Sequence, residues 1–188
     1  MTDQELLHAY ARACDVDCLD TFVRRYQDSL TRFASRFLGD PEAAQDVVQE
    51  TFIQVARNPR RLQDVQNCHN WLLKVARNIG ISRIRHNARV RKHTEAFARR
   101  VAADSAQREE AAGPKALEAE ELRVKVRGEI DRLNPRHREV LLLKIQEDKS
   151  YREISEITGL SITYVGYILH QAMKELSRRL NHSKEDFT

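Results

Sequence analysis

The chain has 188 residues, of which 41% are hydrophobic and 32% are charged, and its formal net charge is +4. This balance is typical of amphipathic helices with solvated polar faces, and the length allows one domain or two small ones. With 6 Gly and 4 Pro, the chain has few of the turns that a sheet protein needs. We therefore predict an all-α protein built from two small helical domains.

Composition and sequence pattern also exclude several classes of protein. No apolar stretch approaches the roughly 20 residues that span a bilayer, and the first residues resemble no secretion signal. We therefore expect a cytoplasmic protein without membrane insertion. The seven histidines lie in no Ser-His-Asp or metal-hydrolase spacing, and no Gly-rich phosphate loop is present. We expect no enzymatic activity and no cofactor.

The cysteines are Cys14, Cys18 and Cys68. An odd number in a chain without an export signal predicts free thiols rather than a disulfide framework. A metal site that adds His69 is the weaker interpretation, because Cys14 and Cys18 lack the Cys-x-x-Cys spacing of common zinc sites. We therefore expect no metal.

Helical signals begin at the start of the chain. Thr2 and Glu5 form a capping-box pattern, which predicts a first helix. A longer helix is predicted by apolar residues at helical spacing: Leu19, Phe22, Val23, Tyr26, Leu30, Phe33 and Phe37. Gly39 ends that helix, and Asp40-Pro41 supplies the cap and first turn of a third one, which runs to about residue 57.

A polar loop over residues 60–70 precedes a strongly basic segment. Trp71 begins an apolar stripe that predicts a fourth helix, and we place its side chain in the core. Between residues 71 and 100 a single acid, Glu95, accompanies nine cations: Lys74, Arg77, Arg83, Arg85, Arg89, Arg91, Lys92, Arg99 and Arg100. This asymmetry indicates a surface that binds a polyanion.

The composition then shifts to Ala, Glu, Gln and Ser, with Gly113-Pro114 in the middle. Such a segment buries too little apolar surface to order itself, so we predict a flexible linker over residues 101–121. It would separate a first domain, residues 1–100, from a second, residues 122–188. Domains joined in this way are expected to tumble semi-independently.

The second domain carries the spacing of a helix-turn-helix. Ser150 and Glu153 form a capping box, Gly159 permits a sharp turn, and Ser161 can cap the next helix. In a DNA-binding protein, outward groups of that second helix enter the major groove. Our candidates for this role are Ser161, Thr163, Tyr164, Tyr167, His170, Gln171 and Lys174. An ordinary helical hairpin is the alternative that the pattern alone leaves open.

The chain as a whole resembles the extracytoplasmic-function group of sigma-70-type factors. Five segments carry this resemblance, in the family's order: Phe22-Val23-Arg24-Arg25-Tyr26, Gly39-Asp40-Pro41, Asp46-Val47-Val48-Gln49-Glu50-Thr51-Phe52, Trp71-Leu72-Leu73-Lys74-Val75-Ala76-Arg77-Asn78 and Leu133-Asn134-Pro135-Arg136-His137-Arg138-Glu139-Val140. The resemblance spans nearly all residues from Leu6 to Leu180. It implies a sigma factor that binds core RNA polymerase and directs promoter recognition and transcription initiation.

The resemblance also implies a role for an acidic ridge on the third helix. Glu42, Asp46 and Glu50 lie four residues apart and share a helix face, which without a partner is only a solvated surface. In the family, the matching segment docks on the clamp helices of the polymerase's largest subunit. Asp46, Gln49 and Glu50 are therefore our candidates for polymerase binding, because acids facing a basic partner fix its register.

The basic fourth helix resembles the segment that opens and reads the minus-ten promoter element. Strand opening needs cations that hold phosphates and a pocket that holds an unstacked base. Our candidates for these contacts are Arg61, Asn67, Asn70, Arg77, Asn78, Arg83 and Arg85. Nonspecific affinity for polyanions is the simpler interpretation of the arginines, and it is compatible with the specific one.

The second domain resembles the family's reader of the minus-thirty-five element, but it departs from the family pattern. Gly166, Ile168 and Gln171 stand where family recognition helices commonly carry arginines, and residues 151–188 have five cations and five acids. This departure and the balanced charge predict weak anchoring to upstream phosphates, although helix N-termini and Arg136 or Arg138 could still hold them.

Two other functions remain open on the sequence. A stand-alone helix-turn-helix transcriptional regulator would need neither the acidic ridge nor the basic fourth helix. A helical scaffold would have no DNA partner. The family resemblance favours the sigma factor, and it adds an anti-sigma factor as a candidate partner because many such factors are held inactive by one.

Overall fold

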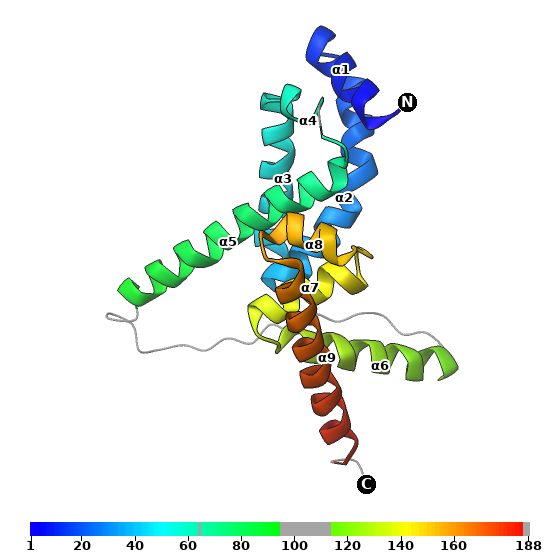
Figure 1. Cartoon of the computed structure of the whole chain (residues 1–188), viewed down its shortest axis with the longest axis vertical. Helices are drawn as coiled ribbons and strands as arrows, with labels where there is room; N and C mark the ends of the chain where they lie inside the picture. Colours follow the sequence, from blue (N-terminus) through cyan, green and yellow to red (C-terminus); the bar gives the residue numbers. More distant parts are fainter. Residues whose placement is uncertain (64, 95–113, 186–188) are drawn as a thin grey trace.

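The computed structural model describes residues 1–63, 65–94 and 114–185, and the side chains of residues 1–61, 65–87 and 122–181. Within these ranges every regular element is a helix, so the all-α prediction is confirmed (Figure 1). In chain order the helices are α1 (Asp3–Ala13), α2 (Val16–Leu38), α3 (Pro41–Arg57), α4 (Arg60–Gln63), α5 (Cys68–Thr94), α6 (Pro114–Asp131), α7 (Pro135–Ile145), α8 (Tyr151–Thr158) and α9 (Ile162–Glu185).

Local capping chemistry sets several of these boundaries. Thr2 and Ser150 each form a complete capping box, with Glu5 and Glu153, at the starts of α1 and α8. The Asp40 carboxylate accepts from two backbone amides at the start of α3, where Pro41 supplies the first turn. Gly39 and Gly159 end α2 and α8 at positive φ, which a residue with a Cβ adopts only with strain.

The first domain consists of α1 to α5. Helix α2 packs against α1, α3 and α5, and α3 also packs against α5. The apolar residues predicted on the long helix supply its centre, since Phe22, Leu30 and Phe33 are fully buried. Trp71 is partly buried against this core, in agreement with its predicted place.

The second domain consists of α6 to α9. Helix α9 packs against α6, α7 and α8, and the turn between α8 and α9 gives the helix-turn-helix arrangement. The domain begins earlier than predicted, because α6 starts at Pro114 within the segment we assigned to the linker. Residues 114–121 read Pro-Lys-Ala-Leu-Glu-Ala-Glu-Glu, which are good helix formers behind a first-turn proline. The rest of the predicted linker, residues 101–113, lies outside the described residues.

The predicted loop over residues 60–70 also contains regular structure. Residues 60–63 form the short helix α4, and α5 already begins at Cys68, three residues before Trp71. The Asn67 side chain explains this earlier start, because its Oδ1 accepts from the Asn70 amide at 2.9 Å as an N-terminal cap does.

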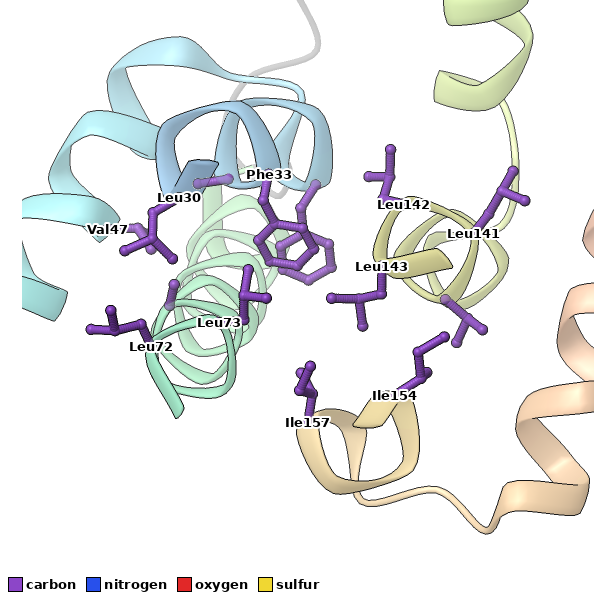
Figure 2. Close-up of a cluster of buried hydrophobic side chains, with 14 of the residues drawn as sticks. Leu30, Phe33, Val47, Leu72, Leu73, Leu141, Leu142, Leu143, Ile154 and Ile157 are labelled. Carbon is purple, nitrogen blue, oxygen red and sulfur yellow. The ribbon is translucent and has the colours of Figure 1, made fainter. Parts of the chain in front are cut away.

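The two domains pack against each other, which differs from the semi-independent arrangement that we expected. Helix α2 contacts α7, and α5 contacts α8. Figure 2 shows the result: Phe33 and Leu73 of the first domain face Leu143 and Ile157 of the second. All four are at most 1% exposed, so the contact between the domains is apolar at its centre.

Candidate functional site

The acidic ridge lies on the outer face of α3. Glu42 and Asp46 are exposed and Glu50 is half-buried. Asp46 is held by the first domain itself, since its Oδ2 accepts from Arg83 of α5 at 2.8 Å. This exposed pair joins a residue predicted to bind polymerase to one predicted to bind DNA. Among the described side chains, Asp46 is therefore the ridge acid that α5 already pairs.

A groove runs between α2 and α3, beside this ridge, and has a volume of about 450 Å³. The apolar part of its lining consists of Leu19, Val23, Val48, Phe52, Ile53 and Ala56. Gln49, one of the predicted polymerase-binding residues, is exposed and lines the same groove. The two helices thus combine an apolar groove with an acidic ridge on one side of the molecule, which suits a helical partner with basic side chains.

The predicted minus-ten residues lie on α4, on the turn before α5 and along α5. We call this set of residues the basic face: Arg61, Asn67, Asn70, Arg77, Asn78, Arg83 and Arg85. Arg83 is set apart from the others, because it points to α3 and pairs with Asp46 there. Arg61, Asn67, Asn78 and Arg85 are exposed, whereas Asn70 is buried. The structure therefore divides these residues into an accessible group and a group that other side chains cover.

The second domain covers part of the basic face with two carboxylates. Glu153 of α8 accepts from Asn70 Nδ2 at 3.0 Å and from Asn67 Nδ2 at 3.5 Å. Glu139 of α7 accepts from Arg77 Nε, in an ion pair whose side chains are 5% and 13% exposed respectively. The hydrogen bonds from the Ser150 backbone and from Asn70 lower the pKa of Glu153 to about 2.

A second polar cluster lies next to these contacts, around His69. Its Nε2 lies 2.9 Å from Ser29 Oγ and 3.3 Å from Glu147 Oε2, and its Nδ1 lies 3.0 Å from Lys149 Nζ. The His69 ring stacks on Tyr26. Burial raises the pKa of Glu147, but the hydrogen bonds from His69 and Ser29 outweigh burial and hold it below its usual value. His69 of the first domain thus contacts Glu147 and Lys149 of the second, and both of these charged side chains are buried.

The helix-turn-helix presents most of its predicted DNA-binding residues to solvent. Thr163, Tyr164, Tyr167, His170 and Lys174 are exposed, Gln171 is half-buried, and the Tyr164 and Tyr167 rings stack 6.0 Å apart. Ser161 is exposed and caps α9, since its Oγ accepts from the Tyr164 amide at 3.3 Å.

Our comparison of Ile168 with the arginines of other recognition helices is wrong for this chain. Ile168 is 1% exposed and belongs to the stripe that packs into the second domain. An arginine at that position would lose its hydration inside the core. Packing therefore explains why this helix has no arginine there, and the apolar residue does not indicate weaker contact with DNA. Gly166 is half-buried, and the Tyr151 ring lies 3.5 Å from where its Cβ would stand.

The cysteines do not come together in a ligand set. Cys14 is exposed, Cys18 is half-buried and Cys68 is buried. Burial and the neighbouring Asp3 raise the pKa of the Cys68 thiol to about 11, which keeps it protonated and unreactive at neutral pH. Across the described side chains, no group of three or more potential ligands is placed to hold a metal ion.

Comparison with known proteins follows the same division of the chain. The family description "Sigma-70 region 2" matches residues 22–90, and "Sigma-70, region 4" matches residues 123–176. The chain is 24% identical over 170 residues to the RNA polymerase sigma factor YlaC of Bacillus subtilis, covering 90% of this chain and 96% of that protein. It is 29% identical to the ECF RNA polymerase sigma factor SigE of Mycolicibacterium smegmatis, covering 88% of this chain and 63% of that longer protein. The chain belongs to the extracytoplasmic-function group of the sigma-70 family.

A solved structure of a sigma factor supports the same fold. The sigma factor RpoE from Bartonella quintana, solved in complex with the anti-sigma factor NepR, aligns with a TM-score of 0.64 and 21% identity, over 82% of this chain and 91% of that one. Among the described residues of the present chain, none of the helices has the length and the apolar character of a membrane-spanning segment.

Sequence reasoning missed the acids that cover the basic face. Glu139, Glu147 and Glu153 meet partners 62 to 118 positions away in the chain, and no local pattern encodes such distances. One signal was available: Glu139 shares a helix face with Leu142 and Leu143, three and four positions on, so it had to be either buried or paired.

Proposed function

We propose that this sigma factor binds core RNA polymerase through the acidic ridge and the α2–α3 groove, and promoter DNA through the basic face and α9. In this mechanism the first domain docks on the clamp helices and melts the minus-ten element. The second domain holds the upstream duplex. Nucleotide transfer belongs to the polymerase, so the chain itself performs no catalysis and acts where the polymerase does, in the cytoplasm.

The observation that carries this proposal is the separation of two chemistries on one small domain. The ridge and the groove offer acids beside apolar side chains, which suits a protein partner, whereas the basic face offers arginines and amides, which suit a nucleic acid. A stand-alone regulator, whose N-terminal helices would dimerise or sense a signal, needs neither the acidic ridge nor the basic face. The match of region 2 to residues 22–90 therefore favours the sigma factor.

The relatives add a candidate regulator. The Bartonella quintana sigma factor was solved together with an anti-sigma factor. We propose that an anti-sigma factor is a partner of this chain too.

Reconstituted transcription tests the proposal. Purified protein is added to bacterial core polymerase with a pool of genomic promoter fragments, and new RNA 5′ ends are sequenced. We expect initiation at a shared two-part promoter with the wild type, and its loss with Glu50→Arg, which places a cation on the ridge.

The control for this experiment is a second charge reversal in the same domain. Asp28 is exposed on α2 and lies outside the groove lining, so Asp28→Arg is expected to initiate as the wild type does. Asp46 is a poorer choice for reversal, because a cation there would also repel Arg83. The proposal would be wrong if the wild type gives no new start sites while the protein alone still binds duplex DNA. That result would favour a stand-alone regulator.

A further inference from the structure

The outward face of α9 is aromatic near its start and cationic further along. Its residues recur at helical spacing, and we call them the reading face: Thr163, Tyr164, Tyr167, His170, Gln171, Lys174 and Arg178. The opposite side of the helix, with Val165, Leu169 and Ala172, is buried in the second domain. Tyr164 and Tyr167 are 45% and 57% exposed. The first turns of α9 therefore present two large rings to solvent.

The two rings form one surface. Their centroids lie 6.0 Å apart, and their planes are inclined to each other by 9°. Single hydrophobic side chains are ordinary on a protein surface, whereas adjacent ones leave a larger apolar area in contact with water and are typical of a site that meets a partner. The stacked pair of Tyr164 and Tyr167 is such an area.

The charges of α9 indicate what kind of partner this is. Lys174 and Arg178 are exposed on the reading face, and the reading face has no acid. The nearby Glu175 lies to one side, where its carboxylate accepts from Arg179 at 2.7 Å and lies 3.3 Å from His137. The balanced total charge of residues 151–188 therefore conceals a face that carries only cations. Such a face complements a polyanion.

The position of the rings along α9 determines which part of a DNA duplex they would meet. In a helix-turn-helix, the first residues of the second helix contact base edges in the major groove. Tyr164 and Tyr167 follow directly after Ser161, which caps α9. Lys174 and Arg178 lie about two and three turns beyond Tyr167. The rings thus occupy the base-reading end of the helix, and the cations occupy an end that can reach phosphates.

We propose that the reading face recognises A·T base pairs of the upstream duplex, with the Tyr164 and Tyr167 rings covering thymine methyl groups and Gln171 bonding an adjacent adenine. This inference rests on the proposed function, because it names the base pairs that α9 reads. The thymine methyl is the apolar group that base pairs present in the major groove, and an aromatic ring contacts it favourably. A glutamine amide matches the N6 and N7 edge of adenine. Guanine is commonly read by arginine or lysine, which the first turns of the reading face lack.

The experiment tests the methyl group directly. A pool of random-sequence DNA duplexes is selected on the full chain, alone and after its addition to core polymerase, and the selected duplexes are sequenced. Each one is then synthesised again with uracil in place of thymine, which removes the methyl groups and leaves base pairing unchanged. Fluorescence anisotropy measures the affinity for both forms.

Substitutions separate the rings from their hydroxyl groups. Tyr164→Phe/Tyr167→Phe keeps both rings, whereas Tyr164→Ala/Tyr167→Ala removes them and places good helix formers at exposed positions. The matched control is Met173→Ala. Met173 is 50% exposed on the same helix, but it lies about a third of a turn around α9 from Tyr167, outside the reading face. Lys174→Ala removes a cation from the end that can reach phosphates.

We expect the selected duplexes to be enriched in A·T pairs. The wild type should bind the uracil form roughly fourfold more weakly for each methyl group that the rings cover, because burial of one such group contributes about that factor. The double phenylalanine variant and Met173→Ala should keep this difference, and the double alanine variant should bind both forms equally. Lys174→Ala should weaken both forms alike and reduce the salt dependence by about one phosphate contact.

Three outcomes would overturn the inference. Equal affinity of the wild type for the thymine and uracil forms would mean that the methyl groups are not read. Loss of the difference in the double phenylalanine variant, or its survival in the double alanine variant, would mean that the rings do not read them. Selection of no duplex, with or without polymerase, would mean that the rings serve a partner other than DNA. If core polymerase gains no start sites with the wild type, the proposed function fails, while selection on the chain alone still decides whether the reading face distinguishes thymine from uracil.

Discussion

The two functional faces of the first domain are built from the same kind of helix but differ in what they contact. Beside the acidic ridge, Asp46 of α3 and Arg83 of α5 form an ion pair whose side chains are 59% and 39% exposed. On the side of the second domain, Arg77 and Glu139 form one whose side chains are 13% and 5% exposed. Arg77 and Arg83 belong to one helix, α5. Their difference shows that tertiary cover, and not residue type, decides which charges are available to a partner.

The largest difference between the two faces is expected in the free energy of unfolding when Arg77 and Arg83 are replaced one at a time. Arg77→Ala leaves Glu139 as an unpaired buried charge, which costs about 3–5 kcal/mol in the packed state. Arg83→Ala removes an exposed pair and costs less than about 1 kcal/mol. Urea denaturation measures both losses. Equal losses would mean that the two faces are equally solvated.

A similar loss is expected from the apolar part of the covered face. Leu143 is fully buried between the domains, so Leu143→Ala is expected to lower the free energy of unfolding by about 2–5 kcal/mol. Ile145 lies on the same helix and is 56% exposed, and Ile145→Ala is expected to change it by less than about 0.5 kcal/mol. Denaturant titration of the two variants provides the comparison, and a stable Leu143→Ala protein would argue against the packed interface.

A substitution in the α2–α3 groove is expected to change the affinity for core polymerase rather than the stability of the fold. Ile53 lines the groove and is half-buried, so Ile53→Asp places a charge where an apolar partner would dock. We expect about a tenfold loss of affinity for core polymerase, which corresponds to about 1.4 kcal/mol. Surface plasmon resonance measures the affinity. An unchanged affinity together with an unchanged melting temperature would remove the groove from the binding surface.

The smallest effect is expected in the pH dependence of the packing between the two domains. The pKa of Glu153 is lowered to about 2, first by the Ser150 amide within its own capping box and then by Asn70 of the first domain, and the pKa of Glu147 is held below its usual value by His69 and Ser29 of the first domain. The bonds that cross between the domains therefore stabilise the packed form above the unfolded pKa values, near 4.5. That contribution is lost as the pH falls from about 5 towards 2. Small-angle scattering between pH 7 and pH 3 should therefore record separation of the domains, and Glu153→Gln should weaken the dependence. A pH-independent radius would contradict this assignment.

The parts of the fold that follow from local chemistry were predictable from the sequence. The capping boxes at Thr2 and Ser150, and the stop at Gly39, involve residues within a few positions of each other, so the pattern and the structure agree. Local reasoning failed where composition was ambiguous. The Ala- and Glu-rich residues 114–121 fit a linker by their low hydrophobicity, but they are also good helix formers, and in the structure they begin α6.

The candidate site was predictable as a set of residues but not as a set of contacts. The acidic ridge and the basic face could be proposed because charges accumulate on single helices. Their separation into an open and a covered face depends on Glu139, Glu147 and Glu153, which reach across the whole chain. The burial of Ile168 is a packing fact of the same kind, since position along α9 alone does not determine how the helix is rotated.

Site-specific photo-crosslinking tests the central claim, that the first domain meets polymerase with α3 and DNA with α5. A photoreactive amino acid replaces either Gln49 or Asn78, both of which are exposed, and an initiation complex is assembled on a promoter found by the reconstituted transcription. The account predicts that position 49 crosslinks to the largest subunit of the polymerase and position 78 to promoter DNA. Crosslinks from position 49 to DNA, or from position 78 to polymerase alone, would contradict it.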